Sequence, residues 1–138
     1  MSTRNIAVED AAKQAPVVDP RANALRERFH AAFGGSDVPV PVESVAEDLL
    51  GLQIAEDDEL DCSGVLLPAQ RQIVVNGREA RESPGRRRFT LAHELGHWVC
   101  QVLEGDTTPM YCRFEEIGVR RRRDPLEREA NVFAAELL

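Results

Sequence analysis

Two histidines and a glutamate stand close together in the segment His93-Glu94-Leu95-Gly96-His97. On an α-helix, residues four apart are neighbours on one face, so His93 and His97 can bind one metal ion from adjacent turns. Glu94 is rotated away from His93 but reaches the rim of such a site, where it can take a proton from a metal-bound water. This spacing is the H-E-x-x-H pattern of zinc hydrolases. It predicts zinc as the cofactor, His93 and His97 as ligands and Glu94 as the catalytic base.

The same three residues have a purely structural interpretation, as core side chains with satisfied hydrogen bonds. Apolar residues surround them on a helix predicted over about 87–103, so the segment should be largely buried. Two buried histidines and a buried glutamate on one helix are costly without a compensating charge, which a divalent cation supplies. We therefore favour the metal site. Gly96, next to the second histidine, has no side chain and lets another backbone pack closely.

A catalytic zinc ion needs a third protein ligand and keeps its fourth position for water. The remaining histidine, His30, is far upstream. Leu103 stands six residues after His97, where some zinc peptidases carry a third histidine. A carboxylate from the terminal helix is therefore the better candidate. Glu127 and Asn131 share a helical face, so Glu127 can bind the metal while Asn131 orients a ligand histidine.

The terminal helix is expected to begin at Asp124-Pro125, because aspartate is a good N-cap and proline suits the first helical position. It offers two further glutamates, Glu129 and Glu136. Glu129 points about 160° away from Glu127 around the helix axis. The alternative for Glu127 is an exposed first-turn glutamate that the helix dipole favours.

The elements that must position these residues indicate an α+β fold, with a helical core and a small antiparallel three-stranded sheet. Residues 1–20 lack periodicity and are predicted to be a poorly ordered lead before a single domain over 21–138. The segment 105–123 is predicted to be irregular, and 83–86 to be a loop. The expected helices cover 21–33, 43–50, 87–103 and 124–138; the expected strands are 52–55 and a hairpin of 64–67 with 72–76.

The overall composition excludes several classes of function. The chain has 138 residues and a formal net charge of −7, which disfavours binding to nucleic acid or anionic lipid. The arginine runs 86–88 and 120–123 are interpreted as solvated faces, with a docking patch for an acidic partner as the lesser alternative. No apolar run is long enough to span a membrane, and no signal core opens the chain. Three cysteines do not make a disulfide framework, so a cytoplasmic protein is expected.

Three further side chains are weaker candidates for a role at the site. Tyr111, the only tyrosine, is a possible oxyanion donor, although tyrosines more often serve in packing. Cys100 follows His97 by three residues, and Cys112 lies in the irregular segment. Either cysteine could, as a thiolate, fill the open position of the metal. The simpler interpretation is that both are ordinary thiols.

Two segments of the sequence resemble the ImmA/IrrE family of metallo-endopeptidases. They are RFTLAHELGHW at residues 88–98 and EREANVFAAELL at residues 127–138, and the predicted hairpin is similar as well. The resemblance covers about residues 40–138. The paired motifs are specific to this family.

The resemblance implies a zincin-like fold and a gluzincin-like centre. In that layout His93 and His97 are zinc ligands, Glu94 is the general base and Glu127 is the third ligand. The family is associated with proteolysis of helix-turn-helix repressors. This chain shows no recognisable helix-turn-helix, so its target would be a separately encoded repressor. Many members carry a histidine where this sequence has Gln101, which is a departure from the family pattern.

A function of another class remains open at this point. The chain could be a zinc-binding regulator that binds and occludes a transcription factor or toxin without cleaving it. Glu94 argues against this alternative, because a structural zinc site does not need a base and usually fills its fourth position with protein.

Overall fold

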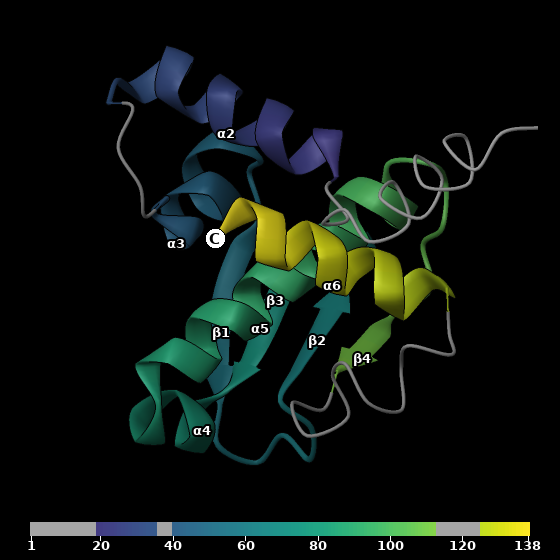
Figure 1. Ribbon diagram of the computed structural model, residues 1–138. Coiled ribbons are helices and arrows are strands. Elements are labelled where there is room, and N and C mark those ends of the chain that lie inside the picture. The colour runs from purple at the N-terminus through teal and green to yellow at the C-terminus, as the bar shows by residue number, and fades with distance from the viewer. Residues whose placement is uncertain (1–18, 36–39, 113–124) are drawn as a thin grey trace, which may run out of the picture.

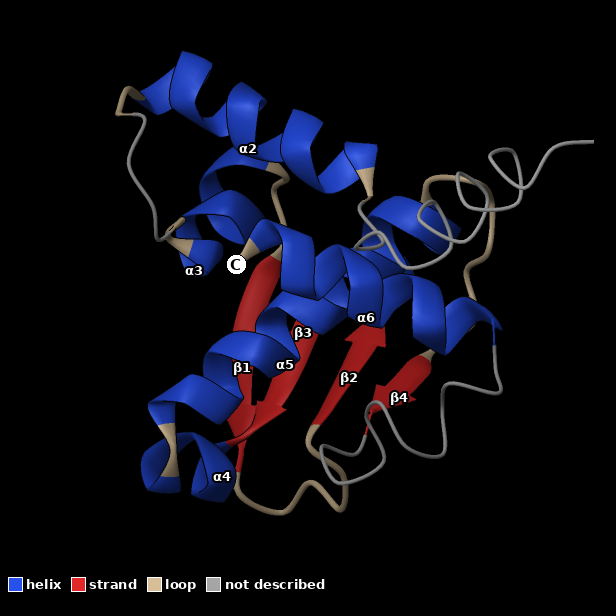
Figure 2. Ribbon diagram, viewed as in Figure 1, coloured by secondary structure: helices blue, strands red, loops and turns tan. Residues whose placement is uncertain are grey.

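The computed structural model describes residues 19–35, 40–112 and 125–138. In these ranges, a mixed sheet has the strand order β1-β3-β2-β4. Strand β3 runs parallel to β1, and β2 is antiparallel to both β3 and β4. The strands are β1 (Gln53–Asp57), β2 (Gly64–Leu67), β3 (Gln72–Asn76) and β4 (Met110–Cys112). Figure 2 shows the strands side by side beneath the helices.

The α+β class and the β2–β3 hairpin are confirmed, whereas the predicted antiparallel three-stranded sheet is wrong in two details. First, β1 pairs with β3 in parallel, because the chain leaves β1 and enters the sheet again on the far side of β3. Local alternation indicates a strand but not the direction of its partner. Second, β4 adds a fourth strand, which is three residues long and therefore too short to show a period of two.

Helix α5 (Pro84–His97) lies on the sheet and carries the H-E-x-x-H segment. Helix α6 (Pro125–Leu137) packs along α5, and helix α2 (Pro20–Phe33) packs on α6 (Figure 1). The core between these layers is apolar because each element turns its aliphatic and aromatic side chains inward. Its largest fully buried apolar side chains are Leu66, Ile73, Leu91, Leu95, Phe133 and Leu137.

A short helix, α4 (Gly77–Glu82), is present where the sequence was not expected to be helical. Asn76 causes it: its side-chain oxygen accepts from the backbone N–H groups of Arg78 and Glu79, which is an N-cap. Ser83 then caps α5 in the same way through Arg86 N–H. The predicted loop at 83–86 is therefore the beginning of α5, and the helix predicted over 87–103 begins earlier.

The helical run after α5 continues as a π-helical segment, η3 (Trp98–Val102). Such wider turns often occur at functional sites. The second predicted helix is also mixed, with α3 (Val42–Ser44) followed by the π-helical η1 (Val45–Leu49). Both segments lie close to the predicted bounds.

Helix α2 begins at Pro20, with Asp19 as its N-cap. The last two residues of the predicted lead therefore belong to this helix and its cap, and residues 1–18 lie outside the described residues. Residues 113–124, most of the predicted irregular segment, lie outside them too. Among the helices that the structure describes, none is long and apolar enough to cross a membrane.

Candidate metal centre

The end of α5 brings His93, Glu94 and His97 together. Their exposed fractions are 0, 0 and 2%, so all three are buried. One potential ligand atom from each lies within 4.8 Å of the others. The two imidazole rings are nearly perpendicular, with 4.8 Å between their centroids, and their four-residue spacing on a helix explains why they lie so close.

Helix α6 places Glu127 against both imidazoles. Its Oε2 lies 2.8 Å from His93 Nε2 and 3.2 Å from His97 Nε2. Glu127 is only 7% exposed, so it is not the solvated first-turn glutamate of the alternative interpretation. Two nitrogens and one carboxylate oxygen therefore face one point between α5 and α6.

Gly96 explains why α6 can lie so close to α5. A Cβ atom at this position would lie 2.9 Å from both the Cα and the carbonyl oxygen of Ala130. Real side-chain carbons do not approach a backbone this closely, so any larger residue would force the helices apart. Gly96 directly precedes His97 on α5, and Ala130 follows Glu127 by three residues on α6. The close contact between them therefore brings Glu127 near the two histidines.

Outer hydrogen bonds hold both imidazoles with Nε2 turned inward. His93 Nδ1–H donates to Asn131 Oδ1 at 2.8 Å, the orienting contact expected for that asparagine. His97 Nδ1–H donates to Gln101 Oε1. When Nδ1 carries the proton, Nε2 keeps its lone pair. With a cation between α5 and α6, both Nε2 lone pairs would face that cation; without one, Nε2 must carry a proton to donate to Glu127 Oε2.

The pKa values reflect this crowding. Burial raises the pKa of Glu127, but hydrogen bonds from His93 and His97 outweigh burial and hold it well below its usual range. Burial lowers the pKa of His93 more than Glu127 raises it. At His97 burial also lowers the pKa, yet the Glu127 contact and the charge of Glu94 raise it above its ordinary value.

Glu94 is the least satisfied group of the site. Neither of its carboxylate oxygens has a hydrogen-bond partner among the described residues. Burial raises the pKa of Glu94 to about 8. The start of β2 lies nearby, since a Cβ atom at Gly64 would be 3.8 Å from Glu94 Cγ and 2.6 Å from Thr90 Cγ2. A buried carboxylate of this kind needs a cation or a proton donor close to it.

The donor set fits zinc. Tetrahedral zinc binds imidazole nitrogen and carboxylate oxygen at about 2.0–2.1 Å, which separates neighbouring ligand atoms by about 3.3 Å. The distances of 2.8 and 3.2 Å from Glu127 Oε2 to the two Nε2 atoms are close to that separation. Two histidines and one carboxylate leave one tetrahedral position for water, with the unpartnered Glu94 carboxylate in the same group.

Cys100 and His30 do not join this cluster. Cys100 Sγ lies 3.9 Å from Asp19 Oδ2, and burial raises the pKa of its thiol to about 12, which opposes a thiolate. His30 Nδ1 faces the carbonyl oxygen of Gly34 at 3.5 Å, at the end of its own helix. The side chains of Tyr111 and Cys112 lie outside the described part of the structure, so their predicted roles stay predictions.

The first arginine run is not a free basic surface. Arg87 pairs with Glu43 at 2.7 Å and with Glu56 at 3.1 Å, and Arg88 donates to the carbonyl oxygen of Val40. These contacts tie the start of α5 to α3 and β1. The second run, 120–123, lies outside the described residues.

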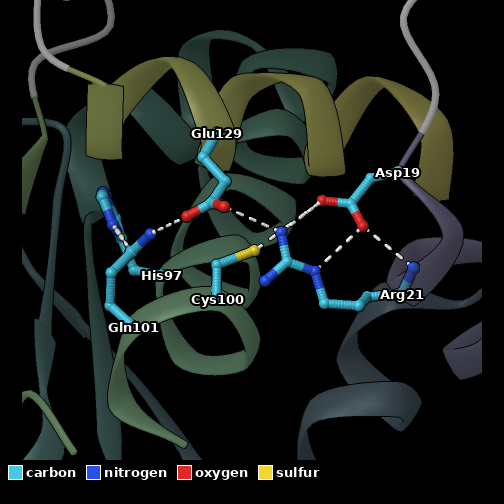
Figure 3. A network of polar contacts seen from close by, with 6 residues as sticks. All are labelled: Asp19, Arg21, His97, Cys100, Gln101 and Glu129. Atoms are coloured by element: carbon cyan, nitrogen blue, oxygen red, sulfur yellow. Dashed lines mark hydrogen bonds and ion pairs between the residues drawn. The ribbon is translucent and has the colours of Figure 1, made fainter. Parts of the chain in front are cut away.

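Two polar residues next to the site were not predicted to matter. Gln101 contacts His97, and Glu129 contacts Gln101 through its Oε1 at 2.7 Å (Figure 3). The four-residue step from His97 to Gln101 is a sequence signal that could have identified the first contact. Glu129 points away from Glu127 as predicted, and no local pattern shows what it meets there.

The fold and the site together define an α+β domain of the metallopeptidase type, with H-E-x-x-H on a helix and a glutamate on the helix beside it. Residues 52–138 match the peptidase family described as the IrrE N-terminal-like domain. The chain belongs to this family of metallopeptidases. A search of curated protein sequences finds no significant match to the chain.

Proposed function

We propose that this metallopeptidase is a zinc-dependent endopeptidase that cleaves one specific regulatory protein, a separately encoded helix-turn-helix repressor. His93, His97 and Glu127 are the zinc ligands in this proposal, Asn131 orients His93, and Glu94 is the base. The observation that carries it is the convergence of both Nε2 atoms on Glu127 Oε2, beside a buried carboxylate without a partner in the described residues.

Zinc, when bound, lowers the pKa of a water molecule and polarises the carbonyl of the bond to be cleaved. Glu94 then accepts the proton of the attacking water and delivers it to the leaving amine. Burial raises the pKa of Glu94 to about 8, and a cation beside the carboxyl would lower the pKa and favour the ionised form that can accept a proton. His93 and His97 keep their Nδ1 protons, because Asn131 Oδ1 and Gln101 Oε1 accept hydrogen bonds from the two Nδ1–H groups.

The sheet offers a place for an extended substrate segment. Among the described strands, β4 is at the end of the strand order, and it contacts α5, which carries the site residues. A peptide that adds to a sheet edge gains main-chain hydrogen bonds, as in β-augmentation. This supports a protein substrate whose cleaved segment is extended. The repressor as substrate rests on the family resemblance of residues 88–98 and 127–138.

The test compares the parent protein with Glu94→Gln, using purified repressor encoded beside this chain as substrate. We expect the parent to bind one zinc ion and cleave, and a chelator to stop cleavage. Glu94→Gln should keep zinc and lose cleavage by about 1000-fold or more, because the amide cannot take a proton. Cleavage at the parental rate by Glu94→Gln contradicts this mechanism. Zinc binding with tight repressor binding but no cleavage by the parent favours the non-cleaving regulator.

A further inference from the structure

The orientation of His97 depends on a residue outside the three proposed ligands. Gln101 is 4% exposed and follows His97 by one helical turn, on the π-helical segment η3. Its Oε1 accepts from His97 Nδ1–H, and its Nε2 donates to Glu129 Oε1 at 2.7 Å. The amide thus lies between an imidazole on α5 and a carboxylate on α6.

The charged groups beyond Gln101 determine which way its amide points. The Glu129 carboxylate can only accept hydrogen bonds, so the amide must turn its NH₂ group toward it. The carbonyl oxygen of Gln101 then faces His97 Nδ1, which must carry a proton to donate. With a metal bound, this leaves the lone pair of His97 on Nε2, the ring nitrogen that faces Glu127. A reversed amide would place its NH₂ group against the Nδ1 proton and its oxygen against Glu129 Oε1, so that both hydrogen bonds would be lost.

Glu129 is itself held by α2. Arg21 Nη2 donates to Glu129 Oε2 at 2.9 Å, and Arg21 also binds Asp19 through Nε at 3.0 Å and Nη2 at 2.9 Å. A guanidinium can only donate, so it secures both carboxylates as acceptors. Figure 3 shows the continuous series of contacts from Asp19 through Arg21, Glu129 and Gln101 to His97.

We propose that Gln101 is a positioning residue, whose orientation Glu129 and Arg21 determine, and that it holds His97 with Nδ1 protonated and Nε2 directed at the metal. The proposal rests on the proposed function in one respect, namely that His97 is a ligand. It extends the centre to Arg21 on α2, a helix that precedes the family-matched residues 52–138.

The first test measures the zinc dissociation constant by competition with a chromogenic chelator. Gln101→Met keeps the side-chain length but removes both hydrogen bonds, and we expect zinc to bind about 10- to 100-fold more weakly. Glu129→Ala leaves Gln101 in place but frees its amide to rotate, and we expect about a 10-fold weakening. In the zinc-saturated proteins, nuclear magnetic resonance of the His97 ring should show an Nδ1 proton that exchanges slowly with solvent in the parent, because Gln101 Oε1 accepts from it, and faster in both variants.

Glu136→Ala is the matched control. Glu136 also lies on α6 and pairs with an arginine of α2, Arg26, at 3.9 Å. That pair does not lead to His97 through any contact among the described residues. Its loss should leave the zinc dissociation constant and the exchange rate of the His97 Nδ1 proton unchanged, which separates the positioning role of Glu129 from a general effect of α2–α6 ion pairs.

A reciprocal exchange tests the direction of the hydrogen bonds. In Gln101→Glu combined with Glu129→Gln, the carboxylate accepts from His97 Nδ1–H, the new amide donates to it, and the amide oxygen accepts from Arg21. Every hydrogen bond of the series is thereby restored. Gln101→Glu alone sets two carboxylates against each other. We expect the double variant to bind zinc within about threefold of the parent, a coupling that neither single change shows.

The outcomes distinguish this inference from the function on which it rests. If the parent binds no zinc, the proposed function fails. If the parent binds zinc but Glu129→Ala binds it equally well and keeps the parental exchange rate of the His97 Nδ1 proton, the positioning role is wrong. Circular dichroism checks that each variant is folded. Should Gln101→Met not fold, Glu129→Ala and the reciprocal exchange still decide the question.

Discussion

At the residue scale, burial affects the two glutamates of the site, Glu94 and Glu127, in different ways. Glu94 is fully buried, and its pKa rises to about 8 because burial disfavours the charged form. Glu127 is almost as buried, but the hydrogen bonds with His93 and His97 hold its pKa well below the usual range and so favour the ionised form. Two glutamates within one centre thus differ in their proton affinity. Such a separation supports the proposal that Glu127 binds the cation and Glu94 moves the proton.

Asp19 provides a pH-dependent contribution to stability away from the centre. It is 5% exposed and caps α2; burial raises its pKa, but the hydrogen bonds from Arg21 outweigh burial and hold the pKa below 3.8. A carboxyl whose pKa is lower in the folded than in the unfolded protein stabilises the fold at pH values above the unfolded pKa. This stabilisation is lost as the pH falls through the lower, folded-state pKa. Asp19→Asn keeps a capping side chain without charge, so we expect it to lower the free energy of unfolding by about 1 kcal/mol at pH 7.

The measurement is urea unfolding of the parent and Asp19→Asn between pH 7 and about pH 3. The difference between the two proteins should shrink as pH falls below the ordinary pKa of 3.8, because the parental aspartate then takes up a proton. A difference that stays constant over this range would show that the charge of Asp19 does not stabilise the fold.

At the element scale, the distance between α5 and α6 determines whether Glu127 meets the histidines. Gly96 and Ala130 allow a backbone-to-backbone approach, and α2 covers α6 from the other side. The π-helical segment η3 directly after His97 places Gln101 back over the imidazole. The site is thus built from the crossing of two helices that are about thirty residues apart in the chain.

Gly96→Ala tests this crossing. The added Cβ would lie 2.9 Å from backbone atoms of Ala130, so we expect a loss of about 1–3 kcal/mol in unfolding free energy, although alanine favours a helix by about 1 kcal/mol. We also expect weaker zinc binding, because α6 carries Glu127 away. Gly85→Ala on the same helix is the control, since a Cβ there meets nothing within 4 Å. Equal stability of the two variants would disprove the close-contact argument.

At the scale of the whole molecule, the centre joins the parts that form the core. His93 and His97 belong to the helix on the sheet, and Glu127 belongs to the helix that packs against α2. A ligand that binds only the folded state raises the free energy of unfolding by mass action. A metal at this centre should therefore stabilise the described domain as a whole.

Zinc should raise the melting temperature of the metal-free protein. At a free zinc concentration about 100 times the dissociation constant, the expected gain in unfolding free energy is about 2.7 kcal/mol. Magnesium at the same concentration should give no shift, because it prefers an octahedral oxygen site. Glu127→Ala should lose most of the zinc effect, and differential scanning calorimetry measures all three. A zinc-induced shift that survives Glu127→Ala would place the metal elsewhere.

Part of the fold and of the candidate site could be predicted from the sequence, because it depends on residues that are close to one another along the chain. The four-residue spacing of His93 and His97 puts them on one helical face wherever the helix lies, and the same holds for Glu127 and Asn131. The hairpin of β2 and β3 and the helical class of the long elements follow from local periodicity in the same way. The sequence did not predict that Asn76 caps helix α4, because asparagine followed by glycine, here Asn76-Gly77, also suits a turn.

The sequence by itself determined the chemistry available to this protein: two imidazoles and a neighbouring carboxylate on one helix, with a second carboxylate and an amide on another. Only the tertiary structure decided what these groups meet. The parallel pairing of β1 with β3, the approach of α6 at Gly96 and the contact of Gln101 with Glu129 and Arg21 all join residues distant in the chain. Local periodicity carries no information on such distances, because packing of the whole core sets them.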